Sequence, residues 1–217
     1  LLFKSMLSRV AESIYWMNRY IERADNVARI VDVNFHLHLD MPSLNGEQWN
    51  ALIHTTGDYE VFVSRLGAPT RETALQFLAF DALNPNSILS CLSAARENAR
   101  TIREIIPSEI WEHVNTFYIM VREAAQRRSL FDSPHEFLEQ VKSDSHLFTG
   151  IAHNCMPHGE VWHFARLGRF IERADKTLRV LDTKTFMELP EREDAGTALD
   201  AIQWAALLRS VSAFEAY

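Results

Sequence analysis

The sequence is poor in the residues that divide a chain into many short pieces. Its 217 residues include only 7 glycines and 7 prolines. Sheets connected by tight turns need more of both, because glycine and proline supply the backbone angles that such turns require. The shortage therefore argues against a sheet protein and favours long helices.

Other shortages limit the compartment and the class of partner. Two cysteines, Cys91 and Cys155, are too few for a disulfide framework and indicate a reducing, cytoplasmic setting. No stretch approaches 18 uncharged apolar residues, so we expect no membrane span and no membrane partner. The net charge is −7. Nucleic-acid binders usually carry a basic excess, so we expect no nucleic-acid partner.

The chain also lacks the short motifs of common cofactor and catalytic sites. It has no glycine-rich loop that could cradle a phosphate, so we expect no bound nucleotide or other cofactor. No Ser-His-Asp or Cys-His arrangement can be argued from spacing. Any ATP used alongside this protein is therefore expected to bind to a partner.

Helical periodicity runs through nearly the whole chain. Apolar residues make up 47% of it, enough for a sizeable core, and residues 8–39 contain no glycine or proline. Asn45, Thr70 and Ser133 are predicted to cap helices. The expected helices are 8–39, 46–66, 70–80, 84–105, 107–128, 133–152, 160–186 and 198–217. We predict an all-α, multi-helix bundle of seven to eight helices that forms one domain over residues 1–217.

The chain resembles itself at an offset of 150 residues. The string I-E-R-A-D stands at 21–25 and again at 171–175. Around it, residues 19, 21–25, 29 and 32 are identical to residues 169, 171–175, 179 and 182. A second block, which includes Gln48-Trp49 and Gln203-Trp204, matches at an offset of 155. Two ordered blocks predict a tandem internal duplication, with a first repeat at about 1–150 and a second at about 151–217.

The second repeat is expected to be incomplete. It has no counterpart of "LNPNSILSCLSAARENARTIRE" at 83–104 before the sequence reaches Tyr217. We therefore expect the natural chain to continue toward roughly twice the repeat period.

Most of the identical repeated residues are charged. Exposed charges should differ between copies, because surface substitutions cost little stability. Exposed ion pairs within one helix contribute only about 0.3–0.5 kcal/mol, too little to preserve so many positions. One hypothesis is a buried ion network, with Glu22 facing Arg173 and Glu172 facing Arg23, or with each pair closing within its own copy. The other is a site where the arginines bind a carboxylate or phosphate. The candidate residues are Arg19, Glu22, Arg23, Asp25, Arg29, Arg169, Glu172, Arg173, Asp175 and Arg179.

Three stretches resemble the alpha-E domain family, a bacterial α-helical family named for its Glu-Arg motif. They are "LSRVAESIYWMNRYIERADNVARIVDV", "SILSCLSAARENARTIRE" and "VWHFARLGRFIERAD", in that order. The motif carries over to Glu22-Arg23 and Glu172-Arg173. The resemblance implies a helical, typically duplicated protein that occurs alongside ATP-grasp ligases, transglutaminase-like proteins and a peptidase of the N-terminal-nucleophile type. It implies a peptide synthesis or modification system but assigns no reaction to the domain.

Three weaker constellations lie outside the repeated motif. Arg96, Arg100 and Arg103 share one helical edge and could bind an anion, although a solvated face of paired charges is the better explanation. The residue types in "HNCMPHGEVWH" at 153–163 suit zinc, but the spacing matches no known zinc signature. The two histidines of "HLHLD" at 36–40 fall on different helical faces. We therefore predict no metal site.

Together these observations predict a noncatalytic helical scaffold or substrate-binding module that acts with an ATP-grasp-type ligase. The alternative is an enzyme that acts on an anionic peptide between the two repeats, using Glu22 and Glu172. A neighbouring arginine keeps a carboxylate ionised, which makes a poor general acid and weighs against the enzyme. A third interpretation is a purely structural subunit of a homo-oligomer.

Overall fold

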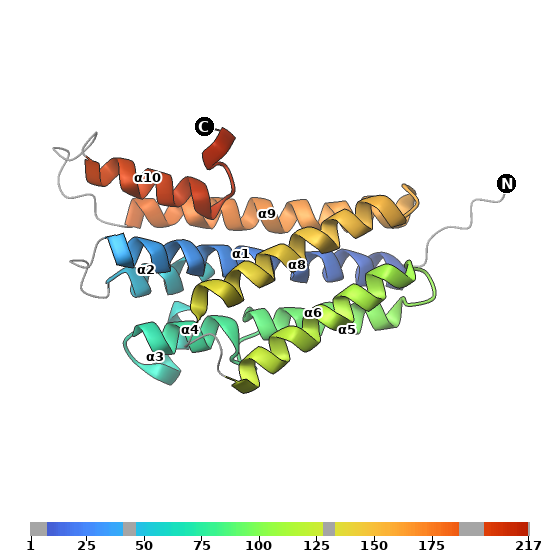
Figure 1. Ribbon diagram of the computed structural model, residues 1–217, viewed down its shortest axis with the longest axis horizontal. Coiled ribbons are helices and arrows are strands. Elements are labelled where there is room, and N and C mark those ends of the chain that lie inside the picture. The colour runs from blue at the N-terminus through green and yellow to red at the C-terminus, as the bar shows by residue number, and fades with distance from the viewer. Residues whose placement is uncertain (1–7, 41–46, 128–132, 187–197, 217) are drawn as a thin grey trace.

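Two long helices lie side by side along the length of the molecule. The computed structural model describes residues 8–40, 47–127, 133–186 and 198–216. Within it, α1 (Ser8–Asp40) and α9 (Glu160–Phe186) pack together and run in the same direction (Figure 1). Four side-chain contacts between them join residues whose numbers differ by 147 to 153. A nearly constant offset means that the helices are parallel and in register.

The other helices are arranged around this pair. On the side of α1 away from α9 lies α5 (Ile88–Thr101), with α6 (Ser108–Arg127) next to it (Figure 1). α8 (Pro134–Cys155) packs on both α1 and α6. The remaining elements are α2 (Glu47–Thr56), α3 (Tyr59–Leu66), α4 (Arg71–Ala79), α10 (Ala198–Ser210) and a 3₁₀ turn at Phe214–Ala216. α2 reaches across to α9, and α10 reaches across to α1.

The all-α prediction is confirmed over the described residues, which contain nine α-helices and no strand. The expected number of seven to eight was too low because 46–66 is not one helix. The chain turns between α2 and α3 at Gly57, whose φ of 82° lies in the left-handed region that favours glycine. The Gly57 N–H bonds to the His54 carbonyl and closes the turn. None of the described helices is long and apolar enough to cross a membrane.

The last helix also ends earlier than the sequence predicted. α10 stops at Ser210, and Ser212 takes a φ of 58°. The Ala213 N–H bonds to the Leu208 carbonyl and the Ser212 N–H to the Arg209 carbonyl, which is the Schellman pattern that terminates a helix. Periodicity alone did not show this stop, because no glycine marks it.

The predicted caps have different outcomes. Thr70 accepts a hydrogen bond from the Thr73 N–H, and the Thr73 hydroxyl accepts one from the Thr70 N–H, so this cap is confirmed as a reciprocal box. Pro134 does open α8, but the Ser133 side chain makes no capping bond. Asn45 lies outside the described residues.

One hydrophobic core spans the helices around α1. Its fully buried side chains include Ile14 and Met17 on α1, Phe77 on α4 and Leu92 on α5. α9 approaches α1 closely at Gly168, where an added Cβ would lie 2.3 Å from the Tyr15 carbonyl oxygen. The tandem duplication, and the division of one domain into repeats near residue 150, stay predictions.

Candidate functional site: a Glu-Arg cluster between two helices

Glu172 on α9 is the fully buried centre of the repeated motif. Its side chain has no exposed surface. Arg19 donates from Nε to Oε2 at 2.8 Å, and Arg23 donates to both carboxylate oxygens at 2.7 and 3.0 Å. Arg23 also donates to the amide oxygen of Asn86, which in turn donates to Asp58. Both oxygens of Glu172 are therefore held by arginines of the neighbouring helix.

Glu22 on α1 has the mirrored arrangement. Arg169 donates from Nε to Oε2 at 3.1 Å, and Arg173 donates from Nε to Oε1 at 2.7 Å. The structure thus places each glutamate between two arginines of the other helix, and the intra-copy alternative does not apply to these four contacts. We call Arg19, Glu22, Arg23, Arg169, Glu172 and Arg173 the Glu-Arg cluster.

The two halves of the cluster differ in exposure. The Arg23 side chain is 15% exposed, whereas that of its counterpart Arg173 is 40% exposed. Arg23 is largely buried and reaches Asn86, just before α5. Arg173 lies nearer to solvent, so the Glu22 half of the cluster is the one that a ligand or partner can reach.

Aromatic rings support the arginines, and the sequence reasoning missed them. The Arg19 guanidinium lies 5.1 Å from the ring centroid of Trp16 and donates to the Tyr15 hydroxyl. Arg23 lies 5.6 Å from the Tyr20 ring, and Arg169 lies 5.8 Å from Phe170. The available signal was the aromatic residue that both I-E-R-A-D stretches carry, at positions 20 and 170.

Electrostatics keep the Glu172 carboxylate ionised. Burial alone would raise its pKa, but the hydrogen bonds and charge of Arg23, together with Arg19, outweigh burial and lower the pKa below its ordinary value. Burial would likewise lower the pKa of Arg23, but its contact with Glu172 raises that pKa. A carboxylate held in this way cannot donate a proton near neutral pH.

Four of the other repeated charges form pairs within their own helices. Arg29 donates to both oxygens of Asp25 at 2.9 and 2.7 Å, and Arg179 donates to Asp175 at 3.2 and 3.1 Å. Asp25 is buried, whereas Asp175 is partly exposed. These four residues lie next to the Glu-Arg cluster along α1 and α9, towards the C-terminal end of each helix.

The arginine row on α5 lies apart from the Glu-Arg cluster. Arg96 donates to Asn115 on α6 and stacks near Tyr118 at 5.3 Å. Arg100 is paired with Glu97 on its own helix. The structure therefore brings Arg96 and Arg100 to the α5–α6 surface and not to the repeated motif.

Among the described residues, one group of three possible metal ligands lies close together, and it differs from the groups considered in the sequence. It consists of Asp32, His36 and His135, whose candidate ligand atoms lie within 4.8 Å of one another. Lys142 already donates to Asp32 Oδ2 at 2.7 Å, and His135 Nδ1 lies 2.9 Å from Oδ1. Burial would raise the pKa of Asp32, but these two contacts lower it. The side chains of His38 and Asp40 lie outside the described residues.

The histidines near the α8–α9 turn lie close to one another, and one of them stacks on a tryptophan. The His158 ring lies 4.1 Å from the Trp162 ring and 5.3 Å from the His153 ring. His158 Nε2 lies 3.1 Å from the His153 carbonyl oxygen. These contacts agree with loop histidines of structural use.

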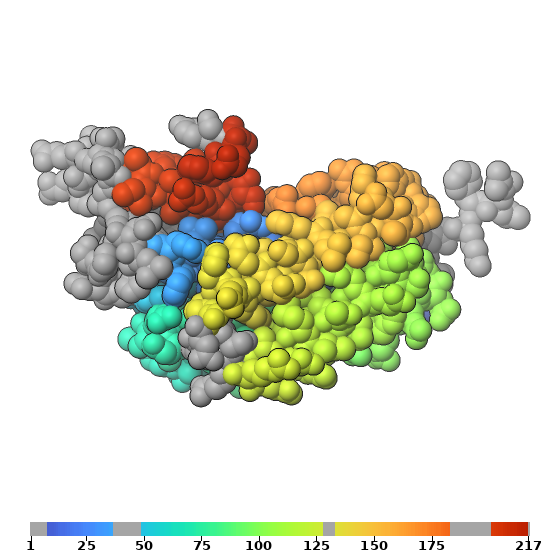
Figure 2. Space-filling view, in the orientation of Figure 1, coloured from blue at the N-terminus to red at the C-terminus, as the bar shows by residue number. Residues whose placement is uncertain are grey.

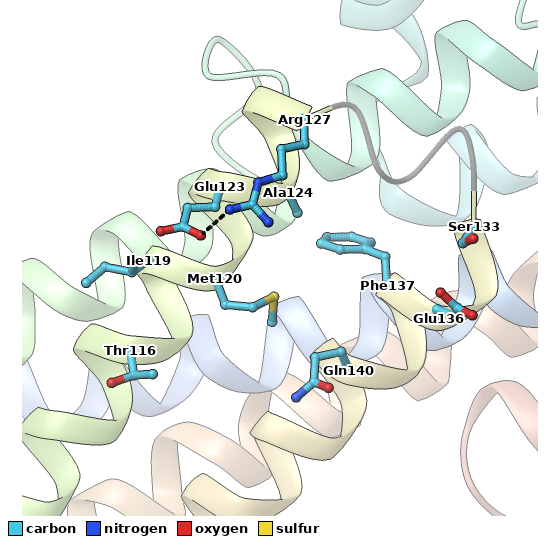
Figure 3. Close-up of a pocket in the computed structure, with 10 residues that line it drawn as sticks. All are labelled: Thr116, Ile119, Met120, Glu123, Ala124, Arg127, Ser133, Glu136, Phe137 and Gln140. Atoms are coloured by element: carbon cyan, nitrogen blue, oxygen red, sulfur yellow. Dashed lines mark hydrogen bonds and ion pairs between the residues drawn. The ribbon is translucent and has the colours of Figure 1, made fainter.

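The described surface has hollows between its helices. One of about 480 Å³ lies between α6 and α8, with Met120 and Phe137 pointing into it and the Glu123–Arg127 ion pair at its rim (Figure 3). Another, of about 210 Å³, lies between α1, α8 and α9. Arg169, a member of the Glu-Arg cluster, lines the second hollow, so that hollow adjoins the motif.

Both repeated Glu-Arg dipeptides therefore lie at the contact between α1 and α9 of an all-helical structure. A family model described as "a predicted alpha-helical domain with a conserved ER motif" matches residues 6–217. The chain belongs to the Alpha-E family. Comparison with curated proteins and with solved structures gives no match in either set. In this Alpha-E domain, the Glu-Arg dipeptides of the repeated stretch are Glu22-Arg23 and Glu172-Arg173.

Proposed function

We propose that this Alpha-E domain is a noncatalytic helical module that binds a partner or substrate for an ATP-grasp-type ligase. The observation that carries this proposal is the state of the two repeated glutamates. Each lies between two arginines of the neighbouring helix, and Glu172 is fully buried. A carboxylate that is buried, ionised and hydrogen-bonded has no free position from which to transfer a proton or attack a substrate.

A substrate-binding role is favoured by the hollow between α1, α8 and α9. Arg166 and Arg169 line it together with His153. The Arg166 guanidinium lies 4.6 Å from the Trp162 ring centroid and 5.1 Å from the Phe170 ring centroid, and contact with two rings restrains its position. A planar, restrained guanidinium suits a carboxylate. We therefore assign this hollow to an acidic side chain or a terminal carboxylate of a peptide.

The partner is proposed from the family resemblance. The sequence has no phosphate-binding glycine loop, so a module of this kind would leave ATP to the ligase. A transglutaminase-like protein is the second partner of the proposed peptide synthesis or modification system. We also propose a cytoplasmic location, which the two free thiols support: Cys91 is buried and Cys155 is exposed without a disulfide.

Co-purification of the full natural protein with the products of its neighbouring genes tests the partner. With the ligase in hand, its KM for an acidic peptide is measured with and without this domain. We expect the domain to lower KM, Arg166→Ala to abolish that effect, and the control Arg122→Ala, which loses an arginine stacked on Tyr118, to retain it. Conversion of the peptide by this domain alone would overturn the proposal in favour of the enzyme alternative.

A further inference from the structure

α9 carries an exposed apolar stripe along its length. Together with Ala174, the residues of this stripe follow one another at alternating steps of three and four, so they lie on one helical face. Their exposed fractions run from 38% to 67%, which is high for large apolar side chains. We call this set the α9 stripe: Phe164, Leu167, Ile171, Leu178 and Leu181.

The residues 150 positions earlier are buried. Their exposed fractions are between 0% and 3%. α5 and α8 pack on α1, and these residues belong to the core that the helices share. The counterparts on α1 are Ile14, Met17, Ile21, Ala28 and Val31. The same face is therefore covered on α1 and uncovered on α9.

The packing of α1 and α9 indicates which kind of helix would cover the exposed face of α9. α1 and α9 are parallel and in register, their glutamates exchange arginines, and α2 and α10 each reach across to the other long helix. These contacts fit an approximate twofold axis running between α1 and α9. α5 lies on the side of α1 away from α9, and α9 forms the upper edge of the molecule beside α10 (Figures 1 and 2). A rotation of α5 about this axis places a helix on the outer face of α9.

We propose that the α9 stripe is a docking surface for an amphipathic helix of the α5 type. The chemistry of α5 defines this occupant. Its buried face combines small and branched side chains, among them Cys91, Leu92 and Ala95, which let two helices approach closely. Asn86, just before α5, accepts a hydrogen bond from Arg23 Nη1.

The exposed half of the Glu-Arg cluster supplies the matching polar contact. Arg173 is the counterpart of Arg23 and holds Glu22 through Nε. Its side chain is the most exposed of the four cluster arginines, at 40%. A docked helix with an asparagine before its first turn would accept a hydrogen bond from Arg173, as Asn86 does from Arg23. The occupant is therefore recognised by an apolar stripe and one polar contact, independently of the ligase proposed above.

A fluorescently labelled peptide of residues 83–104 tests the proposal, because it contains Asn86 and the whole of α5. We expect saturable binding to the 217-residue chain by fluorescence anisotropy. Leu178→Asp should abolish binding, and its high exposure means that the fold should survive, which circular dichroism can check. The matched control is Leu147→Asp, an exposed leucine on α8 that should leave binding unchanged.

A double-mutant cycle on the polar contact gives a second readout. Arg173→Ala in the protein and Asn86→Ala in the peptide should each weaken binding, by about 10- to 100-fold for one hydrogen bond to a charged group. The double change should cost no more than either change alone. No binding up to about 1 mM peptide, or equal binding to Leu178→Asp, would overturn the proposal. So would a dimer in light scattering that Leu178→Asp converts to a monomer, because the stripe would then be covered by a second copy.

Discussion

At the scale of single residues, the same Glu-Arg motif sits in two different environments. Glu172 has no exposed surface and binds two arginines that are themselves mostly buried. Glu22 binds Arg169 and Arg173, which are nearer to solvent. Removing the carboxylate partner of an arginine costs less stability where water can solvate that arginine than where it is buried. The two glutamates should therefore differ in their contribution to stability.

The first prediction compares the two glutamates directly. Glu172→Ala should destabilise the protein by about 3–5 kcal/mol, because it leaves Arg19 and Arg23 without their carboxylate. Glu22→Ala should cost clearly less. Urea unfolding at neutral pH measures both. The double variant Glu172→Ala/Arg23→Ala should cost less than the sum of its single changes, since the second change removes a stranded charge. Equal losses at the two glutamates, or full additivity, would contradict the buried-network interpretation.

The lowered pKa of Glu172 makes a prediction about acid. Because the folded-state pKa lies below the unfolded one, the stabilisation is fully present above the ordinary pKa of 4.5 and is lost as the pH falls through the lowered folded value. The melting temperature of the native protein should therefore fall on acidification below about pH 4.5. Glu172→Gln removes this titrating group, so its melting temperature should fall less over the same range. Parallel curves for the two proteins would refute the assignment.

Zinc should not bind stoichiometrically, despite the histidines. A zinc ion between Asp32, His36 and His135 would have to displace the His135 contact and lie close to the ammonium group of Lys142. Elemental analysis of the purified protein is expected to find far less than one zinc per chain. About one zinc per chain, lost in His135→Ala or in His158→Ala, would show which histidine group binds it and would refute the prediction.

At the scale of elements, the contact between α1 and α9 depends on one position without a side chain. A Cβ on Gly168 would meet the Tyr15 carbonyl oxygen at 2.3 Å, and that oxygen belongs to a helix backbone that cannot move alone. The close approach at this point lets the arginines of one helix reach the glutamate of the other.

Gly168→Ala should therefore be destabilising. We expect a loss of about 1–3 kcal/mol, typical of overpacking, although alanine is the better helix former. Gly150→Ala in α8 is the matched control, because nothing lies within 4 Å of its added Cβ. That control should be neutral or stabilising by up to about 1 kcal/mol. Thermal melts of the two variants measure the difference, and a stable Gly168→Ala would mean that the helices lie further apart.

The elements also show what the sequence could predict. Long periodic stretches such as 8–40 and 160–186 were predictable, because many residues repeat one helical signal. The break at Gly57 was not, since one glycine inside a periodic stretch is often tolerated. The repeated charges pointed to Glu22 and Glu172. Asn86 gave no such signal, because it meets Arg23 only through packing between residues 63 positions apart.

At the scale of the whole molecule, α1 is the hub. It packs on α2, α4, α5, α8, α9 and α10. α9 carries the same repeated motif as α1, but it packs on fewer of the described helices. The exposed α9 stripe is the consequence, and it makes the two long helices unequal: one is enclosed by partners, and the other presents an apolar face at the edge.

The spacing of the Glu-Arg cluster along the chain affects the order of folding. Its ion pairs join residues 147 to 153 positions apart, so none can form until the second helix exists. At a synthesis rate of roughly 5–20 residues per second, α1 waits on the order of ten seconds on the ribosome with Arg19, Glu22 and Arg23 unpaired. Contacts this distant in sequence also slow refolding, because a long loop must close first. The contacts between α1 and α9 are therefore expected to form late in folding.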